Sequence, residues 1–268
     1  MTQAIKKSLR DSAAMRWTAL LLLALAMFCS YIFMDILSPI KDLMQTERGW
    51  DSLAFGTMQG SEVFLNVFVF FLIFAGIILD KMGVRFTAVL SGAVMLVGAI
   101  VKWYAVSDSF IGSGLETWFT ENLNYIPLFD ELGVSPFYEG MPASAKLAAC
   151  GFMIFGCGCE MAGITVSRGI VKWFKGREMA LAMGSEMALA RLGVATCMIF
   201  SPFFAKLGGN VSVSRSVAFG VVLLCIALIM FVVYFEAHST SADPAELRVL
   251  VPVGQLMTLA CQSVVRFR

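Results

Sequence analysis

Two residues of opposite charge, Glu160 and Arg191, lie near the middle of two long apolar segments. An ionisable group in apolar surroundings needs a partner, a water-filled cavity or a function. If the two segments are antiparallel neighbouring helices, the two charges lie at similar depth. They then either form a structural ion pair or line a cavity that offers one charge of each sign to a zwitterionic solute, and we favour the cavity.

Other polar residues in the apolar segments need the same explanation. Asp35, at the end of the first segment, either contacts the solute or reaches the membrane surface. Glu62 and Asn66 are four residues apart, so they share one helix face and are expected to face protein or water rather than lipid. Lys102 and Arg168 lie close to segment ends, and we expect both side chains to extend to the membrane surface.

The composition identifies a membrane protein. Of the 268 residues, 59% are hydrophobic and 15% are charged, and the mean hydropathy is +0.80. Soluble domains carry about 25% charged residues. The net charge of +1 gives no field that would attract nucleic acid. His238 is the only histidine, Cys157 and Cys159 lack the spacing of a zinc motif, and no catalytic motif is present, so we expect no metal, no cofactor and no enzymatic activity.

Six apolar stretches reach the length of about 20 residues that a membrane-spanning helix needs. They cover residues 17–40, 53–79, 86–106, 146–170, 179–205 and 216–235. The sequence therefore predicts an all-α membrane protein with a six-helix transmembrane domain over residues 17–235. Two pairs of small residues, Gly158 with Ala162 and Gly184 with Ala188, predict close contacts between helices.

The distribution of basic residues predicts the orientation in the membrane. With segment 1–16 in the cytoplasm, nine basic residues lie on the cytoplasmic side and five on the opposite side. The nine are Lys6, Lys7, Arg10, Arg16, Lys81, Arg85, Lys172, Lys175 and Arg177, and the five are Lys41, Arg48, Lys146, Lys206 and Arg215. The loop 107–145, on the outer side, contains no basic residue. We therefore expect a cell-membrane protein with a cytoplasmic N-terminus, and the short tails without sorting signals favour a bacterial inner membrane.

Residues 236–268 differ from the rest of the chain. The sequence turns polar after Glu236, and the apolar run Leu247–Ala260 is too short to span a membrane. This segment is either a peripheral cytoplasmic tail or a run of out-of-frame residues from a truncated or frameshifted reading frame. We favour the second interpretation.

The turn between the second and third segments combines five residues with distinct roles. Gly76 permits close approach of another helix, and Gly83 allows a tight turn. Asp80 can cap the next helix, while Lys81 and Arg85 hold the turn in the cytoplasm.

This turn resembles the loop signature of the major facilitator superfamily, G-x-x-x-D-[RK]-x-G-x-[RK], which that family also places between its second and third helices. Phe86 departs from the pattern, because a second basic residue often stands there. The resemblance implies that Asp80 makes a charge and helix-end contact that stabilises an outward-open state.

Three further stretches, 155–160, 172–178 and 190–193, are similar to one branch of the superfamily, the lysosomal dipeptide uniporters and their bacterial relatives. In that branch a glutamate of the fourth helix and an arginine of the fifth bind the charged termini of a dipeptide. The resemblance assigns these roles to Glu160 and Arg191.

The likeness covers about residues 15–235. The first helix looks like that of the same branch more loosely, so Tyr31 and Asp35 join the expected solute site. Family members have twelve helices in two halves, with the solute at the midplane between halves that rock against each other. Because this chain has six expected helices, the resemblance implies a missing C-terminal half or a second chain as partner.

The leading hypothesis is the N-terminal half of a transporter that moves small zwitterionic solutes, dipeptides foremost, by alternating access. Glu160 would bind the ammonium group and Arg191 the carboxylate through charge-assisted hydrogen bonds. One alternative is a proton-coupled carrier of another small organic solute, with Glu160 as its proton site. The other is a non-transporting membrane scaffold subunit. The expected partners are a small-molecule solute, the lipid bilayer and the second half.

Overall fold

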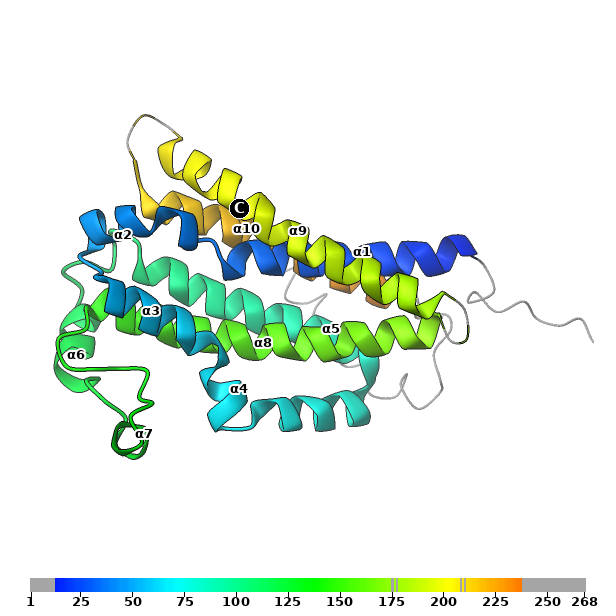
Figure 1. Cartoon of the computed structure of the whole chain (residues 1–268), viewed down its shortest axis with the longest axis horizontal. Helices are drawn as coiled ribbons and strands as arrows, with labels where there is room; N and C mark the ends of the chain where they lie inside the picture. The colour runs from blue at the N-terminus through cyan, green and yellow to red at the C-terminus, as the bar shows by residue number, and fades with distance from the viewer. Residues whose placement is uncertain (1–12, 175, 177, 208, 210, 238–268) are drawn as a thin grey trace, which may run out of the picture.

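The structure is a computed structural model that describes residues 13–174, 176, 178–207, 209 and 211–237, and all regular structure within them is helical (Figure 1). The expected N-terminal segment and tail lie almost wholly outside the described residues. The elements in chain order are α1 (Ala13–Met34), η2 (Ser38–Ile40), α2 (Lys41–Arg48), α3 (Ser52–Gly60), η3 (Ser61–Val63), α4 (Phe64–Phe68), α5 (Phe71–Ala105), α6 (Gly114–Asn122), α7 (Pro127–Glu131), α8 (Ala143–Trp173), α9 (Met179–Lys206) and α10 (Val213–Ala237).

Five helical stretches in the described residues are long and apolar enough to cross a membrane, where we expected six. The difference arises in α5, because Gly83 has φ 82° and ψ 165°, which are not helical angles. Figure 1 shows that the chain reverses direction within α5. The first part of α5 therefore completes the second expected segment, and the second part forms the third. The path of the chain still follows six segments.

The prediction of one continuous helix over 53–79 is wrong. The segment is divided into α3, η3, α4 and the start of α5, with Phe70 in the left-handed region at φ 55°. Gly60 and Ser61 stand at the first break, and Gly/Ser pairs are common sites of helix kinks. The Ser61 hydroxyl hydrogen-bonds to Met58 O at 2.6 Å and to Ala149 O of α8 at 3.1 Å, which stabilises the break.

Glycines bring α5 and α8 into close contact. A Cβ atom on Gly98 would lie 2.5 Å from Gly151 O, and one on Gly151 would lie 2.7 Å from Lys102 N. One on Gly158 would lie 2.6 Å from Met95 N, so the close contact predicted at Gly158 is confirmed. Gly184 has no described atom within 4 Å of such a position, and the contact predicted there is absent from the described chain.

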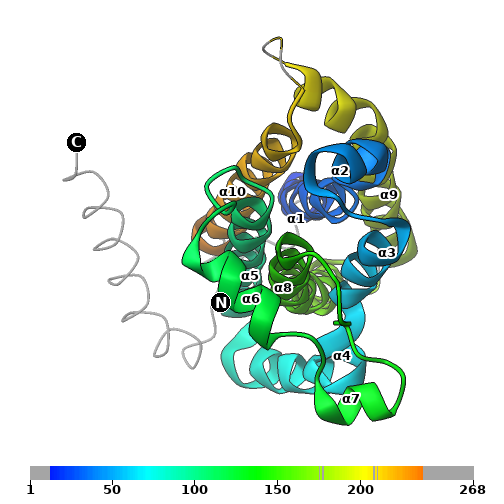
Figure 2. The ribbon, with the colours of Figure 1, turned by 90° about the vertical axis from the view of Figure 1, so that its left-hand side faces the viewer.

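The first helix, α1, lies at the centre of the bundle between α8, α9 and α10 (Figure 2). Its buried side chains form the core with those of the helices around it. In contrast, α9 exposes many large apolar side chains, namely Leu181, Met187, Leu192, Met198, Ile199 and Phe203. In a membrane protein such a surface faces lipid or another helical unit.

The loop that carries α6 and α7 is held against the start of α8. Lys146 is buried, and its Nζ donates hydrogen bonds to Phe119 O at 3.1 Å and to Asn124 Oδ1 at 2.8 Å. Tyr138 of the same loop donates a hydrogen bond to the carboxylate of Asp51, which also caps α3. Desolvation raises the pKa of the Tyr138 hydroxyl, and the negative charge of Asp51 raises it further.

Candidate functional site

Arg191 of α9 lies over the ring of Tyr31 of α1. Its Cζ is 5.6 Å from the ring centroid, within the range of a cation–π contact. Gly193 permits this approach of the two helices, because a Cβ atom there would lie only 2.6 Å from Phe28 O. Arg191 is an exposed residue, and its guanidinium contacts the aromatic ring.

Glu160 of α8 and Glu186 of α9 complete this group of charges. The charges of Glu160, Glu186 and Arg191 all act on the Tyr31 hydroxyl, which places the four side chains in one region. Glu160 is partly exposed, whereas Glu186 is buried. Glu160 and Arg191 make no ion pair with each other within the described chain, whose ion pairs join other residues. The structural ion pair considered from the sequence is therefore absent in this conformation.

Asp35 follows the end of α1 and accepts a hydrogen bond from the Ser38 hydroxyl at 3.3 Å. Its charge acts on Glu62 and on Lys102. Asp35 is partly buried, and its charge belongs with those of Glu62 and Lys102 rather than with the charges that act on Tyr31.

The prediction that Lys102 extends to the membrane surface is wrong. The side chain is 0% exposed, and its Nζ lies 3.5 Å from the ring centroid of Phe152 and 5.3 Å from that of Phe33. Lys102 follows Gly98 by four residues, so it shares the face of α5 that packs closely on α8. The spacing of Lys102 from Gly98 was the sequence signal for this burial.

Glu62 and Asn66 face protein, as predicted. Both amide atoms of Asn66 are buried and have no hydrogen-bond partner among the described residues. The main chain of Glu62 packs directly against Gly156 of α8, and its Cγ would lie 3.0 Å from a Cβ atom there.

Asp80 pairs with Arg168 of α8. The contact brings the end of the second segment, just before the break at Gly83, beside the last turns of α8. Both side chains remain accessible, with 71% of Asp80 and 50% of Arg168 exposed. The acidic residue of the turn therefore has a partner within the same six-segment unit.

The other residues of the turn differ in their surroundings. The tight turn predicted at Gly83 is confirmed by its positive φ. Lys81 is exposed and Arg85 is buried. No described atom lies within 4 Å of a Cβ position on Gly76, so the helix contact predicted there is absent from the described chain.

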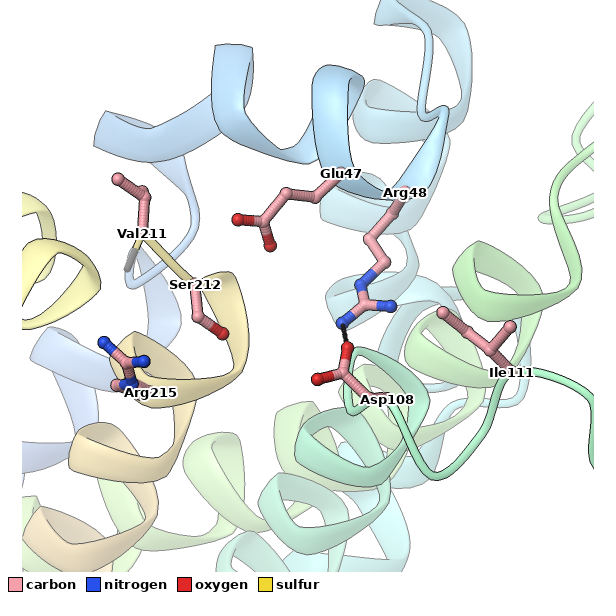
Figure 3. Close-up of a pocket in the computed structure, with 7 residues that line it drawn as sticks. All are labelled: Glu47, Arg48, Asp108, Ile111, Val211, Ser212 and Arg215. Carbon is pink, nitrogen blue, oxygen red and sulfur yellow. Dashed lines mark hydrogen bonds and ion pairs between the residues drawn. The ribbon is translucent and has the colours of Figure 1, made fainter. Parts of the chain in front are cut away.

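A cavity of about 420 Å³ lies at the opposite end of the bundle, between the ends of α2, α5 and α10 (Figure 3). Arg48 pairs with Asp108 across it at 2.5 Å, and Glu47 accepts a hydrogen bond from Val213 N at 3.1 Å. The remaining lining residues are Ile111, Val211, Ser212 and Arg215. None of the site residues predicted from the sequence lines this cavity, whose polar contacts fasten three helix ends together.

The model of the Major Facilitator Superfamily matches residues 23–263 of the chain. The chain belongs to this superfamily. No curated protein and no solved structure matches it. The major facilitator match extends through most of the segment that the sequence analysis set apart as a tail. Membership makes the chain an all-α membrane transporter of small solutes, since members of the superfamily are transporters rather than enzymes.

Within this major facilitator unit, Glu160 and Arg191 could be singled out from the sequence because charges within apolar segments are conspicuous. The protein-facing side of Glu62 could also be predicted, but its connection with Lys102 could not. That connection depends on three separate elements, η3, α5 and α8, which only the folded chain brings together.

Proposed function

We propose that this chain is the N-terminal half of a transporter for small zwitterionic solutes, with dipeptides as the leading solute class. Glu160 binds the solute ammonium group and Arg191 binds its carboxylate. One observation carries the proposal: the two opposite charges share the surroundings of Tyr31 without neutralising each other. Both therefore keep hydrogen-bonding capacity for a ligand that carries one charge of each sign.

Arg191 and Glu160 lie in different surroundings, and each is suited to its proposed contact with the solute. The Tyr31 ring contacts one face of the Arg191 guanidinium, and Arg191 has no ion pair among the described residues, so its N–H groups can bind a carboxylate in a bidentate manner. Glu160 comes from a different helix, so the spacing between the charges depends on how α8 and α9 are placed. A solute that bridges them would therefore favour one arrangement of the bundle.

The proposal extends to the assembly. A second half, supplied by a C-terminal continuation or by a second chain, covers the exposed side of α9, while both charged contacts with the solute, Glu160 and Arg191, belong to this chain. Transport then follows from rocking of the two halves in a cell membrane, with the N-terminus in the cytoplasm.

Calorimetric titration of the purified chain with dialanine tests the solute assignment. We expect Glu160→Gln and Arg191→Ala each to weaken binding at least about tenfold, because each removes one charge-assisted contact. Glu121→Gln, an exposed carboxyl of α6, is the matched control and should bind like the parent. N-acetylated dialanine, which lacks the ammonium group, should bind the parent as weakly as dialanine binds Glu160→Gln. Binding of dialanine that is unchanged in both charge variants would disprove the assignment.

A further inference from the structure

A second group of charges adjoins the proposed solute site. We call Glu62, Lys102 and Asp35 the inner charge cluster. Its three members come from η3, α5 and the segment after α1. The charges of Glu62 and Asp35 both act on Lys102, and those of Lys102 and Asp35 both act on Glu62. The proposed solute contacts do not use this cluster.

Lys102 is the most unusual member of the cluster. Its ammonium is completely buried, and its Nζ has no hydrogen-bond partner among the described residues. The rings of Phe152 and Phe33 provide cation–π contacts, but neither Glu62 nor Asp35 lies within ion-pair distance of it. A buried cation without a hydrogen-bonded anion depends on negative charge nearby. The charge of Lys102 is therefore coupled to the protonation of its neighbours.

Glu62 connects the cluster to the solute site. Its main chain and Cγ pack against Gly156 of α8, which precedes Glu160 by four residues, or about one helical turn. The charges that act on Glu62 come from Glu160 on α8, Lys102 on α5 and Asp35 after α1. Those that act on Lys102 are Glu62, Asp35 and the Cys197 thiol of α9. A change of charge on Glu62 therefore changes the electrostatic potential both at Glu160 and at Lys102.

We propose that Glu62 is a proton-binding site with Lys102 as its buried counter-charge, and that protonation of Glu62 weakens the binding of a solute cation at Glu160. The first statement stands on the cluster alone, and the second rests on the proposed function. Ionised Glu62 adds negative charge beside Glu160 and so favours the solute ammonium, whereas protonated Glu62 does not. Solute binding therefore releases a proton, and affinity rises with pH through the titration of Glu62.

Infrared difference spectroscopy of the full chain in lipid tests the proton site without any solute. As the pH is stepped from about 5 to about 9, the range in which buried carboxyl groups titrate, the parent should lose the C=O band of one protonated carboxyl group. Glu62→Gln should remove this band, and Glu62→Asp should keep it at a shifted frequency. Glu121→Gln, which removes an exposed carboxyl of α6 far along the chain from the cluster, should leave the band unchanged.

Lys102→Met distinguishes a paired site from an isolated carboxyl group. A nearby cation favours the ionised carboxylate, so its removal should move the titration of the band to higher pH by about one unit or more. The proton site is disproved if the parent shows no such band, if Glu62→Gln retains it, or if Lys102→Met leaves its midpoint in place.

Calorimetric titration with dialanine across the same pH range tests the coupling. The affinity of the parent should rise about tenfold, a typical coupling between two sites, and Glu62→Gln should bind weakly at every pH. Titration of the peptide itself affects both proteins equally, so the difference between them reports Glu62. Binding with the same pH dependence in both proteins would disprove the coupling. If the parent does not bind dialanine, the proposed function fails, while the infrared result still decides the proton site.

Discussion

At the scale of single residues, two buried lysines on facing helices differ in the hydrogen bonds that their ammonium groups make. Lys102 on α5 is 0% exposed and Lys146 on α8 is 1% exposed. Lys146 donates two hydrogen bonds to the loop before α8, whereas the Nζ of Lys102 has no described acceptor. Burial alone therefore does not tell whether a charge stabilises the fold, because the free energy of a buried charge depends on its hydrogen bonds.

This difference predicts opposite effects of the same substitution. Lys102→Met should leave the free energy of unfolding unchanged or raise it by about 1–2 kcal/mol, since an apolar side chain of similar size removes a costly buried charge. Lys146→Met should lower it by about 1–3 kcal/mol, because Phe119 O and Asn124 Oδ1 lose their donor. Thermal unfolding of the detergent-solubilised variants measures both, and a Lys102→Met variant less stable than Lys146→Met would contradict the argument.

The pair between Asp80 and Arg168 is a different kind of charge contact. Both side chains are at least half exposed, so solvent screens their attraction. A double-mutant cycle with Asp80→Asn and Arg168→Gln should give a coupling of less than about 1 kcal/mol in thermal stability. A coupling of several kcal/mol would show instead that the pair is shielded from water. A small coupling combined with a large loss of transport would assign the pair to conformational change rather than to folding.

At the scale of helices, glycine contacts decide which elements pack closely. Gly98→Ala should destabilise the chain by about 1–3 kcal/mol or more, since the new methyl group would collide with the main chain of α8 and overpacking is costly. Gly184→Ala is the matched control, because its position on α9 has no described neighbour within 4 Å. That variant should be neutral or slightly more stable, as expected for alanine in a helix. Equal loss of thermal stability in both variants would contradict the packing of α5 on α8.

The same contacts explain how much of the fold could be predicted from the sequence. The expected segments 146–170 and 179–205 match α8 and α9 closely, because an uninterrupted apolar run of that length has few alternatives to a helix. Hydropathy could not reveal the breaks in the second segment, the first of which is stabilised by the hydrogen bond from Ser61 to α8. In the candidate site, Arg191 could be singled out from the sequence because it is a charge in the middle of an apolar segment. The burial of Lys102 could not, because it depends on the approach of a second helix.

At the scale of the whole molecule, the ends of the bundle differ in chemistry. One end carries the turn around Gly83 with exposed Lys81, and the other carries the loop with α6, which contains no basic residue. The rule that basic residues remain in the cytoplasm predicts that the Gly83 end is cytoplasmic. The cavity lined by Arg48 and Asp108 then opens on the outer side.

Cysteine labelling in intact bacterial cells tests this orientation. In a background whose native cysteines are replaced, Glu121→Cys on exposed α6 should react with a charged, membrane-impermeant maleimide. Lys81→Cys should react only after the cells are opened. Both positions are exposed in the structure, so a difference in labelling reports the side of the membrane rather than burial. Labelling of Lys81→Cys alone in intact cells would reverse the orientation, and would put the Asp80 and Arg168 pair on the outer face.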